Sequence, residues 1–194
     1  MATKYSFVTI WRFDAPIDAV WDIIIHSERW PEWWKYVQSV VELEPGDENG
    51  LGSLQHITWT SALPYKLSFD SRVTRVEKPY LIEGVARGEL NGTGRWQLSQ
   101  EGSITIVRYD WNVSTSKSWM NLLAPVARPI FEWNHNILMD EGGRSLALLL
   151  HAHLLDIPRQ KSGGMPRILV VLGAATSLAL VTRMMYVIIK RGSR

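Results

Sequence analysis

The chain of 194 residues contains no cysteine, which excludes disulfide bonds, thiolate metal sites and a thiol nucleophile. It also lacks a strong charge imbalance, because 21 basic and 19 acidic residues give a formal net charge of +2. This balance is not the footprint of a nucleic-acid-binding protein. The segment 1–13 lacks the basic region and apolar run of a secretion signal, so we expect the main domain to stay in the cytoplasm.

Catalytic fingerprints are missing as well. The sequence contains no phosphate-binding loop, nucleophile elbow, HExxH segment or dinucleotide-binding motif. We therefore predict no metal and no cofactor, and the motifs point to no particular reaction.

Tryptophan is abundant, with ten residues in the chain. The hydrophobic content of 46% is ordinary for a globular protein, and the length favours one domain with an appendage. So many large rings suit a thick core, a cavity lined with aromatic side chains, or both.

The first two thirds of the chain predict one strand, two short helices and six more strands. Residues 5–13 form a β-branched and aromatic run, and Asp14 and Pro16 then mark a helix start. A second short helix or turn is expected within 27–35. The six further strands are expected at 37–43, 51–60, 65–76, 80–87, 90–98 and 103–115. Their period-2 alternation predicts an antiparallel sheet with one covered face and one wet face.

A long helix over 118–155 is expected to cover that sheet. Its apolar residues repeat at helical spacing, and three polar residues, Asn134, Glu141 and Ser145, fall inside the apolar face. Glu141 must therefore be paired, protonated or turned toward a cavity. Pro125 and Pro129 predict a break or kink, with the firm helix beginning near Pro129.

This order of elements is an α+β layout in which the sheet curls around the terminal helix. Gly92 and Gly94 lie on the inward face of their strand. They leave room either for a close approach of the helix or for a ligand.

Several short segments, in this order, resemble one family. They are Ala15-Pro16, Val20-Trp21, residues 30–34 (Trp-Pro-Glu-Trp-Trp), Gly50-Leu51-Gly52, Gly94-Arg95-Trp96, and Trp133-Asn134-His135-Asn136 before Met139 and Gly142. Together they resemble the polyketide cyclase/dehydrase and lipid-transport branch of the START-like (SRPBCC) superfamily, over about residues 4–155. The resemblance implies a helix-grip fold, a seven-stranded antiparallel sheet wrapped on a long helix with a deep hydrophobic cavity between them. It also implies binding of a lipid, polyketide or isoprenoid, but no single chemistry.

The candidate ligand-binding residues come from the inward strand faces and from the long helix. They are Trp59, Phe69, Trp96, Tyr109, Trp111, Asn134, Leu138 and Glu141. The aromatic residues either line a pocket or only pack the core. Asn134 either faces the cavity or is a core amide satisfied by sheet carbonyls or water.

Two titratable residues of the helix are weighed as acids or bases. Glu141 would have a raised pKa if it is desolvated, but an ion pair with one of the strand arginines, such as Arg72, Arg75 or Arg95, is the favoured interpretation. His135 lies about 100° from the centre of the apolar face, so it is expected at the helix margin rather than in a catalytic site.

The C-terminal part predicts a linker and a hydrophobic helix. We place the domain at 1–157, the linker at 158–167 and the hydrophobic helix at 168–190. At about 1.5 Å per residue, a helix over 168–189 spans about 33 Å, enough for a hydrocarbon core of about 30 Å. Its Leu, Ile and Val residues contribute about 5 kcal/mol to insertion, which exceeds the cost of about 2.5–3.5 kcal/mol for Arg183. A helix on the lipid surface or packed on the domain is the alternative.

Three functional hypotheses remain open. The first is a membrane-tethered carrier or sensor that binds an apolar small molecule, held at the cytoplasmic membrane by the C-terminal helix. The second is a cyclase- or dehydrase-type enzyme that uses Glu141 or His135 together with Tyr109 as acid or base. The third is an adaptor whose aromatic surface binds a protein partner.

Overall fold

The computed structural model describes residues 4–62, 65–116 and 118–155, with the side chains of 118–127 left out of the description. Its elements, in chain order, are β1 (Lys4–Asp14), α1 (Ile17–Ile25), the 3-10 helix η1 (Ser27–Arg29), α2 (Trp30–Trp33), β2 (Val37–Glu44), β3 (Leu54–Trp59), β4 (Leu67–Glu77), β5 (Leu81–Gly88), β6 (Leu90–Glu101), β7 (Ile104–Thr115) and α3 (Ser118–Leu149).

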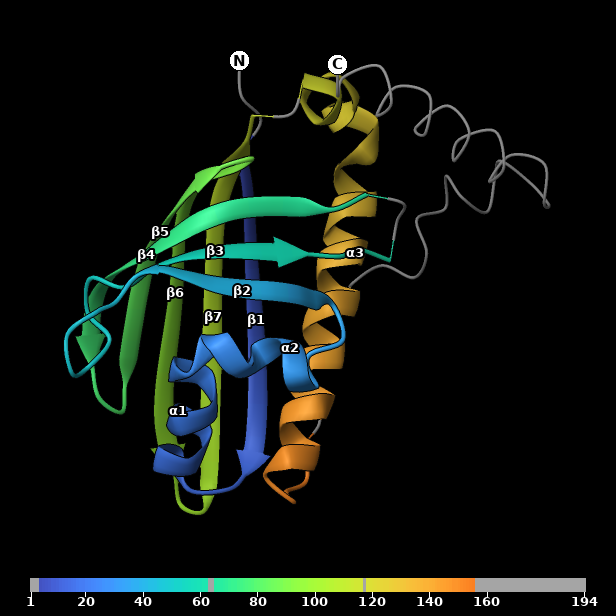
Figure 1. The fold of residues 1–194 in the computed structure, drawn as a ribbon. Coiled ribbons are helices and arrows are strands. Elements are labelled where there is room, and N and C mark those ends of the chain that lie inside the picture. The colour runs from blue at the N-terminus through green and yellow to red at the C-terminus, as the bar shows by residue number, and fades with distance from the viewer. Residues whose placement is uncertain (1–3, 63–64, 117, 156–194) are drawn as a thin grey trace.

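The strands form a single seven-stranded sheet. Its order is β1-β7-β6-β5-β4-β3-β2, and every neighbouring pair is antiparallel. The sheet curls around α3, and the short helices lie near the end of α3 that is drawn in orange (Figure 1). The predicted α+β helix-grip fold is thereby confirmed, because alternating inward residues leave one sheet face to be covered by an amphipathic helix.

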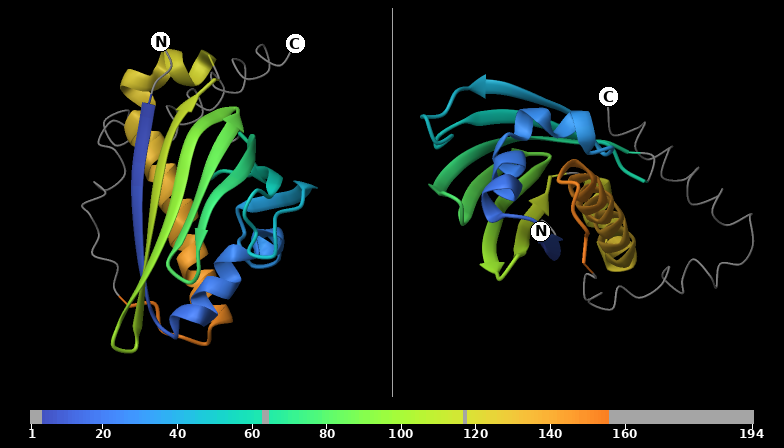
Figure 2. Two further views of the ribbon diagram at one scale, coloured as in Figure 1. Left: turned by 90° about the vertical axis from the view of Figure 1, so that its left-hand side faces the viewer. Right: turned by 90° about the horizontal axis from the view of Figure 1, so that it is seen from below.

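The long helix differs from its predicted extent at its C-terminal end. It ends at Leu149 rather than near Leu155, and His151 has a positive φ of 48°. The chain then returns along β1, where the Leu155 amide donates to the Arg12 carbonyl at 2.9 Å. Leu148, one residue before this end, is 76% exposed. At the other end, Figure 2 shows the first turns of α3, in yellow, bending away from the rest, as Pro125 and Pro129 predict.

Two glycines allow the second half of α3 to approach the tryptophans of the core closely. A Cβ on Gly142 would overlap the Trp34 ring, and one on Gly143 would lie 2.7 Å from Trp11 Nε1. Trp34 Nε1 also donates to the Leu138 carbonyl of α3 at 2.9 Å. These contacts fix the height of α3 above the sheet and close the space beneath its C-terminal half.

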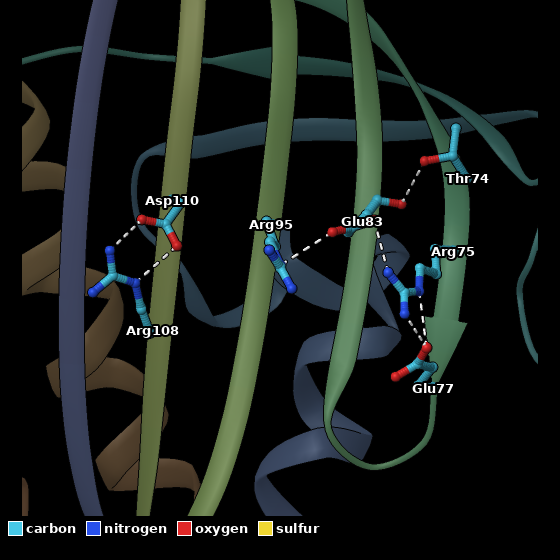
Figure 3. A network of polar contacts seen from close by, with 7 residues as sticks. All are labelled: Thr74, Arg75, Glu77, Glu83, Arg95, Arg108 and Asp110. Atoms are coloured by element: carbon cyan, nitrogen blue, oxygen red, sulfur yellow. Dashed lines mark hydrogen bonds and ion pairs between the residues drawn. The ribbon is translucent and has the colours of Figure 1, made fainter.

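The outer face of the sheet carries ion pairs (Figure 3). Arg95 Nε lies 3.0 Å from Glu83 Oε1, and Arg108 donates to both carboxylate oxygens of Asp110 at 2.7 and 2.8 Å. Such exposed pairs contribute about 0–1 kcal/mol each. They mark this face as the wet one and leave the concave face for the site.

The linker at 158–167 and the hydrophobic helix at 168–190 lie outside the described residues, so both stay predictions. Within the described ranges, no helix is both long and apolar enough to span a membrane.

Candidate functional site: an aromatic cavity between sheet and helix

A cavity of about 110 Å³ lies between the concave sheet face, α2 and the middle of α3. By this measure about 10–15 Å³ holds one water molecule, so the cavity admits a small organic group without rearrangement. Its lining comprises Tyr5, Phe7, Trp30, Trp34, Trp59, Thr60, Ser61, Tyr65, Leu67, Phe69, Leu90, Trp96, Tyr109, Trp111, Val113, Phe131, Asn134, His135, Leu138 and Met139. None of these side chains is a carboxylate, an ammonium or a guanidinium.

Seven of the eight candidate residues line this cavity together. They are Trp59, Phe69, Trp96, Tyr109, Trp111, Asn134 and Leu138. The strand residues meet because cross-strand partners share a face: Trp96 lies opposite Tyr109, and Gly94 lies opposite Trp111. Their role in ligand binding stays a prediction.

Glu141 is the candidate that the structure places elsewhere. It does not line the cavity, although it lies on the helix face of Asn134 and Leu138. The cavity ends at Met139, because Trp34 packs against the α3 backbone at Gly142 and fills the space beyond. Glu141 is half-buried, and its Oε1 accepts a long hydrogen bond of 3.5 Å from Ser145 Oγ.

The predicted ion pair of Glu141 with a strand arginine is also wrong. Arg72 pairs with Glu44 at 2.7 Å, Arg75 pairs with Glu77 and Glu83, and Arg95 pairs with Glu83. These arginines are bound to strand carboxylates and do not reach the helix that packs on the concave face.

Stacked rings form the wall of the cavity. The Trp96 and Tyr109 rings are stacked with centroids 4.0 Å apart, and Tyr109 stacks on Trp111 at 5.9 Å. Trp59 meets the Trp34 ring edge-on at 5.0 Å. Large rings held by one another present a broad, rigid apolar surface that loses little entropy when a flat or extended apolar ligand binds.

Polar groups gather where α3 meets the connection between β3 and β4. Asn134, 5% exposed, accepts hydrogen bonds from Ser61 Oγ at 2.8 Å and from the Ala62 amide at 3.1 Å. Its Nδ2 donates to Tyr65 Oη at 3.4 Å, and burial raises the pKa of Tyr65 to about 12. Asn134 therefore holds this connection against the helix. Its partners are a loop hydroxyl and a loop amide rather than sheet carbonyls.

Two of the residues that line the cavity carry buried donors without partners among the described residues. Tyr5 Oη and Trp30 Nε1 make no hydrogen bond, although their side chains are only 4% and 8% exposed. Burial also raises the pKa of Tyr5, so its hydroxyl keeps its proton. A buried donor without a hydrogen-bond partner lowers the stability of the folded protein by about 1–3 kcal/mol. A ligand oxygen that accepts from either group would remove that cost.

His135 lies in the cavity wall and not at the helix margin as predicted. Its ring stacks on Phe7 with centroids 4.4 Å apart, and its Nε2 lies 3.4 Å from Thr9 Oγ1. Burial lowers the pKa of His135 to about 4 and raises the pKa of Tyr109. Both groups are uncharged at neutral pH, which suits an apolar site and makes His135 a weak general base. In the part of the chain that the structure describes, no cluster of His, Asp and Glu is arranged to hold a metal.

Sequence reasoning missed most of the residues at the two ends of the cavity. Tyr5 and Phe7 alternate along β1, and Phe131 lies one turn before Asn134 on the helix, so these three carried a periodic signal. Ser61 precedes β4 in an irregular connection, where no periodicity exists to find it.

The fold and this cavity define a START-like helix-grip protein. The family model for polyketide cyclase/dehydrase and lipid transport matches residues 13–139, and the chain belongs to that family. A comparison with curated protein sequences found no significant match.

Solved structures share the fold at low identity. A START superfamily protein from Mycobacterium smegmatis is 12% identical with a TM-score of 0.60, over 76% of this chain and 97% of that one. The aromatase/cyclase Zhui from Streptomyces sp. R1128 is 14% identical with a TM-score of 0.60, over 77% and 94%. The di-domain aromatase/cyclase BexL of the BE-7585A biosynthetic pathway is 18% identical with a TM-score of 0.60, over 77% of this chain and 51% of BexL. The chain thus spans about half the length of that di-domain protein.

Proposed function

We propose that this protein is a carrier or sensor that binds an apolar small molecule, of lipid, polyketide or isoprenoid type, in the cavity between sheet and α3. The observation that carries the proposal is the composition of the wall. Aromatic side chains make up more than half of its described lining residues, none of those residues is ionised, and its histidine is uncharged at neutral pH. Such a site gains free energy mainly by removing apolar surface from water, about 25 cal/mol per Å².

The hydrogen-bond donors that lack partners predict one chemical feature of the ligand. Tyr5 Oη and Trp30 Nε1 are buried in the wall without partners among the described residues. The favoured ligand therefore has an apolar body and at least one carbonyl, ether or hydroxyl oxygen. A pure hydrocarbon would leave both donors unsatisfied and bind more weakly.

A cavity-filling substitution tests the proposal. Leu138→Trp places an indole in the cavity, whereas Leu148→Trp adds the same ring at a position of α3 that is 76% exposed. The probe is N-phenyl-1-naphthylamine, an uncharged compound whose fluorescence rises in apolar surroundings. Leu138→Trp should weaken its binding by about tenfold or more, equivalent to about 1.4 kcal/mol. Equal binding by both folded variants would contradict the proposal.

A membrane tether is the second part of the proposal. The support is the apolar run at 168–189, which as a helix would be long enough to cross a hydrocarbon core of about 30 Å. A tether would raise the effective concentration of the cavity near lipid-like ligands. We expect the full chain to resist alkaline carbonate extraction from membranes, and a Leu178→Arg, Leu180→Arg double variant to be extracted. Extraction of the unaltered chain would rule out a spanning tail.

The enzyme alternative is retained because His135 and Tyr109 both line the cavity. Glu141 no longer supports it, because that carboxylate lies outside. If the protein cyclises a linear polyketone, product formation should be lost in His135→Gln while N-phenyl-1-naphthylamine still binds. Turnover that is equal in His135→Gln and the unaltered protein would remove His135 from any acid–base role.

The adaptor alternative loses its basis. Among the described large hydrophobic side chains that are exposed, Tyr80 is the only aromatic one.

A further inference from the structure

A second cavity of about 460 Å³ lies on the other side of the aromatic wall. It is bounded by the end of α1, by η1, by the connection between β2 and β3, and by the concave face of the sheet. Six residues line both cavities: Trp30, Trp59, Phe69, Trp96, Tyr109 and Trp111. The two spaces are therefore separated by one layer of rings.

The second cavity differs from the first in its polar lining. Ser71 of β4 lies directly opposite Gln55 of β3, which in turn lies opposite Glu42 of β2. All three face the second cavity, and Ser53, which directly precedes β3, lines it as well. This gives a polar row across three strands, next to the aromatic wall.

Gln55 is buried but only partly satisfied. Its side chain is 8% exposed, and its Oε1 accepts a hydrogen bond from Ser27 Oγ at 2.6 Å. No second partner for the amide exists among the described residues, and the hydroxyls of Ser53 and Ser71 are likewise without one. Ser53 is 7% exposed. The amide therefore has both of its N–H donors available to a molecule that enters the cavity.

The charges around this cavity have one predominant sign. Its lining includes five carboxylates, Asp22, Glu28, Glu42, Asp47 and Glu48, and a single lysine, Lys78. Asp47 is engaged in its own turn, where its Oδ1 accepts from the amides of Asn49 and Leu51. Glu42 lies in the polar row itself and makes no ion pair with a described residue. The resulting negative potential attracts cations and repels anions.

We propose that the second cavity is a separate binding site for a small aromatic amino alcohol. The protonated amine is held by the Glu42 carboxylate, and the ligand hydroxyl bonds the free half of the Gln55 amide and the Ser71 hydroxyl. The aromatic body of the ligand packs against the shared ring layer, which also attracts an ammonium group within about 6 Å. The two sites share the ring layer but not these polar groups, because Glu42, Gln55 and Ser71 do not line the first cavity.

Three matched compounds test the assignment by isothermal titration calorimetry on the full chain. 2-Amino-1-phenylethanol carries both groups, phenethylamine lacks the hydroxyl, and mandelate replaces the amine with a carboxylate. We expect the amino alcohol to bind most tightly. Loss of the hydroxyl should weaken binding by about 3-fold or more, because its hydrogen bonds to Gln55 and Ser71 are lost, and mandelate should not bind.

Variants locate the site. In Gln55→Leu the amino alcohol should lose its advantage over phenethylamine, and Ser71→Ala provides a milder check if Gln55→Leu does not fold. Glu42→Gln, at an exposed position, should weaken both amines by a similar factor. Leu138→Trp should leave amine binding intact while it reduces binding of N-phenyl-1-naphthylamine, so the two sites can fail separately. Equal affinity for all three compounds, no binding up to their solubility limits, or affinities unchanged by Gln55→Leu and Glu42→Gln would overturn the proposal.

Discussion

The hydrogen bonds of Asn134 give the sharpest prediction about how the cavity is kept open at its polar end. Its Oδ1 accepts two hydrogen bonds of ordinary length, from Ser61 Oγ and from the Ala62 amide. The third contact, to Tyr65 Oη at 3.4 Å, is too long to contribute much. Asn134→Leu keeps the volume of the side chain and removes all three.

The expected cost follows from those two bonds. Each contributes about 0.5–1.5 kcal/mol net, and a buried donor left without a partner loses more. Ala62 is exposed and Ser61 half-buried, so water can replace part of what is lost. We therefore expect Asn134→Leu to lower the free energy of unfolding by about 1–2 kcal/mol. We also expect faster amide exchange at Ala62, because the connection is no longer held to α3.

Denaturant unfolding and hydrogen exchange of the full chain test this prediction. Asn136→Leu is the matched control, since Asn136 lies on the same helix, is half-buried and makes no hydrogen bond with a described residue. The reasoning would be refuted if the two variants lost equal stability, or if Asn134→Leu were as stable as the unaltered protein.

Two further predictions concern packing and pH. Gly142→Ala should destabilise the fold by about 1–3 kcal/mol, the usual cost of overpacking, because the added Cβ would overlap the Trp34 ring. Thermal unfolding measures this cost, and Arg144→Ala, at an exposed position of the same helix, is the control. Burial lowers the pKa of His135 to about 4, so between about pH 6.5 and 4 the unfolded chain binds a proton that the folded chain does not. Stability should therefore fall as the pH decreases through this window, by at most about 3 kcal/mol from this group. In His135→Gln that part of the pH dependence should disappear, and an unchanged slope would show that His135 titrates normally.

Much of the site was predictable because side chains along a strand alternate between the two faces of the sheet. Alternation along β6 and β7 places Trp96, Tyr109 and Trp111 on one face, and the antiparallel register then brings them side by side. The helical period likewise places Asn134 and Leu138 on the face toward the sheet. These inferences need only local geometry.

The sequence-based predictions were wrong where the position of a side chain depends on a second helix or strand that packs against its own. A helical wheel gives the direction of Glu141 but not the length of the cavity, which Trp34 ends by packing on Gly142. The same wheel placed His135 at the margin, whereas Phe7 of β1 stacks on it and extends the wall around the helix. Leu148 carried an apolar signal, yet it lies one residue before the end of the helix and is exposed.

The central claim is that the cavity between sheet and α3 holds an apolar small molecule, and native mass spectrometry with lipid extraction of the purified full chain tests it most directly. We predict a co-purifying molecule with an apolar body and at least one oxygen, and its loss in Leu138→Trp but not in Leu148→Trp. An empty, folded protein that also fails to take up a panel of lipids, polyketides and isoprenoids would contradict the claim, and would reduce the aromatic wall to core packing.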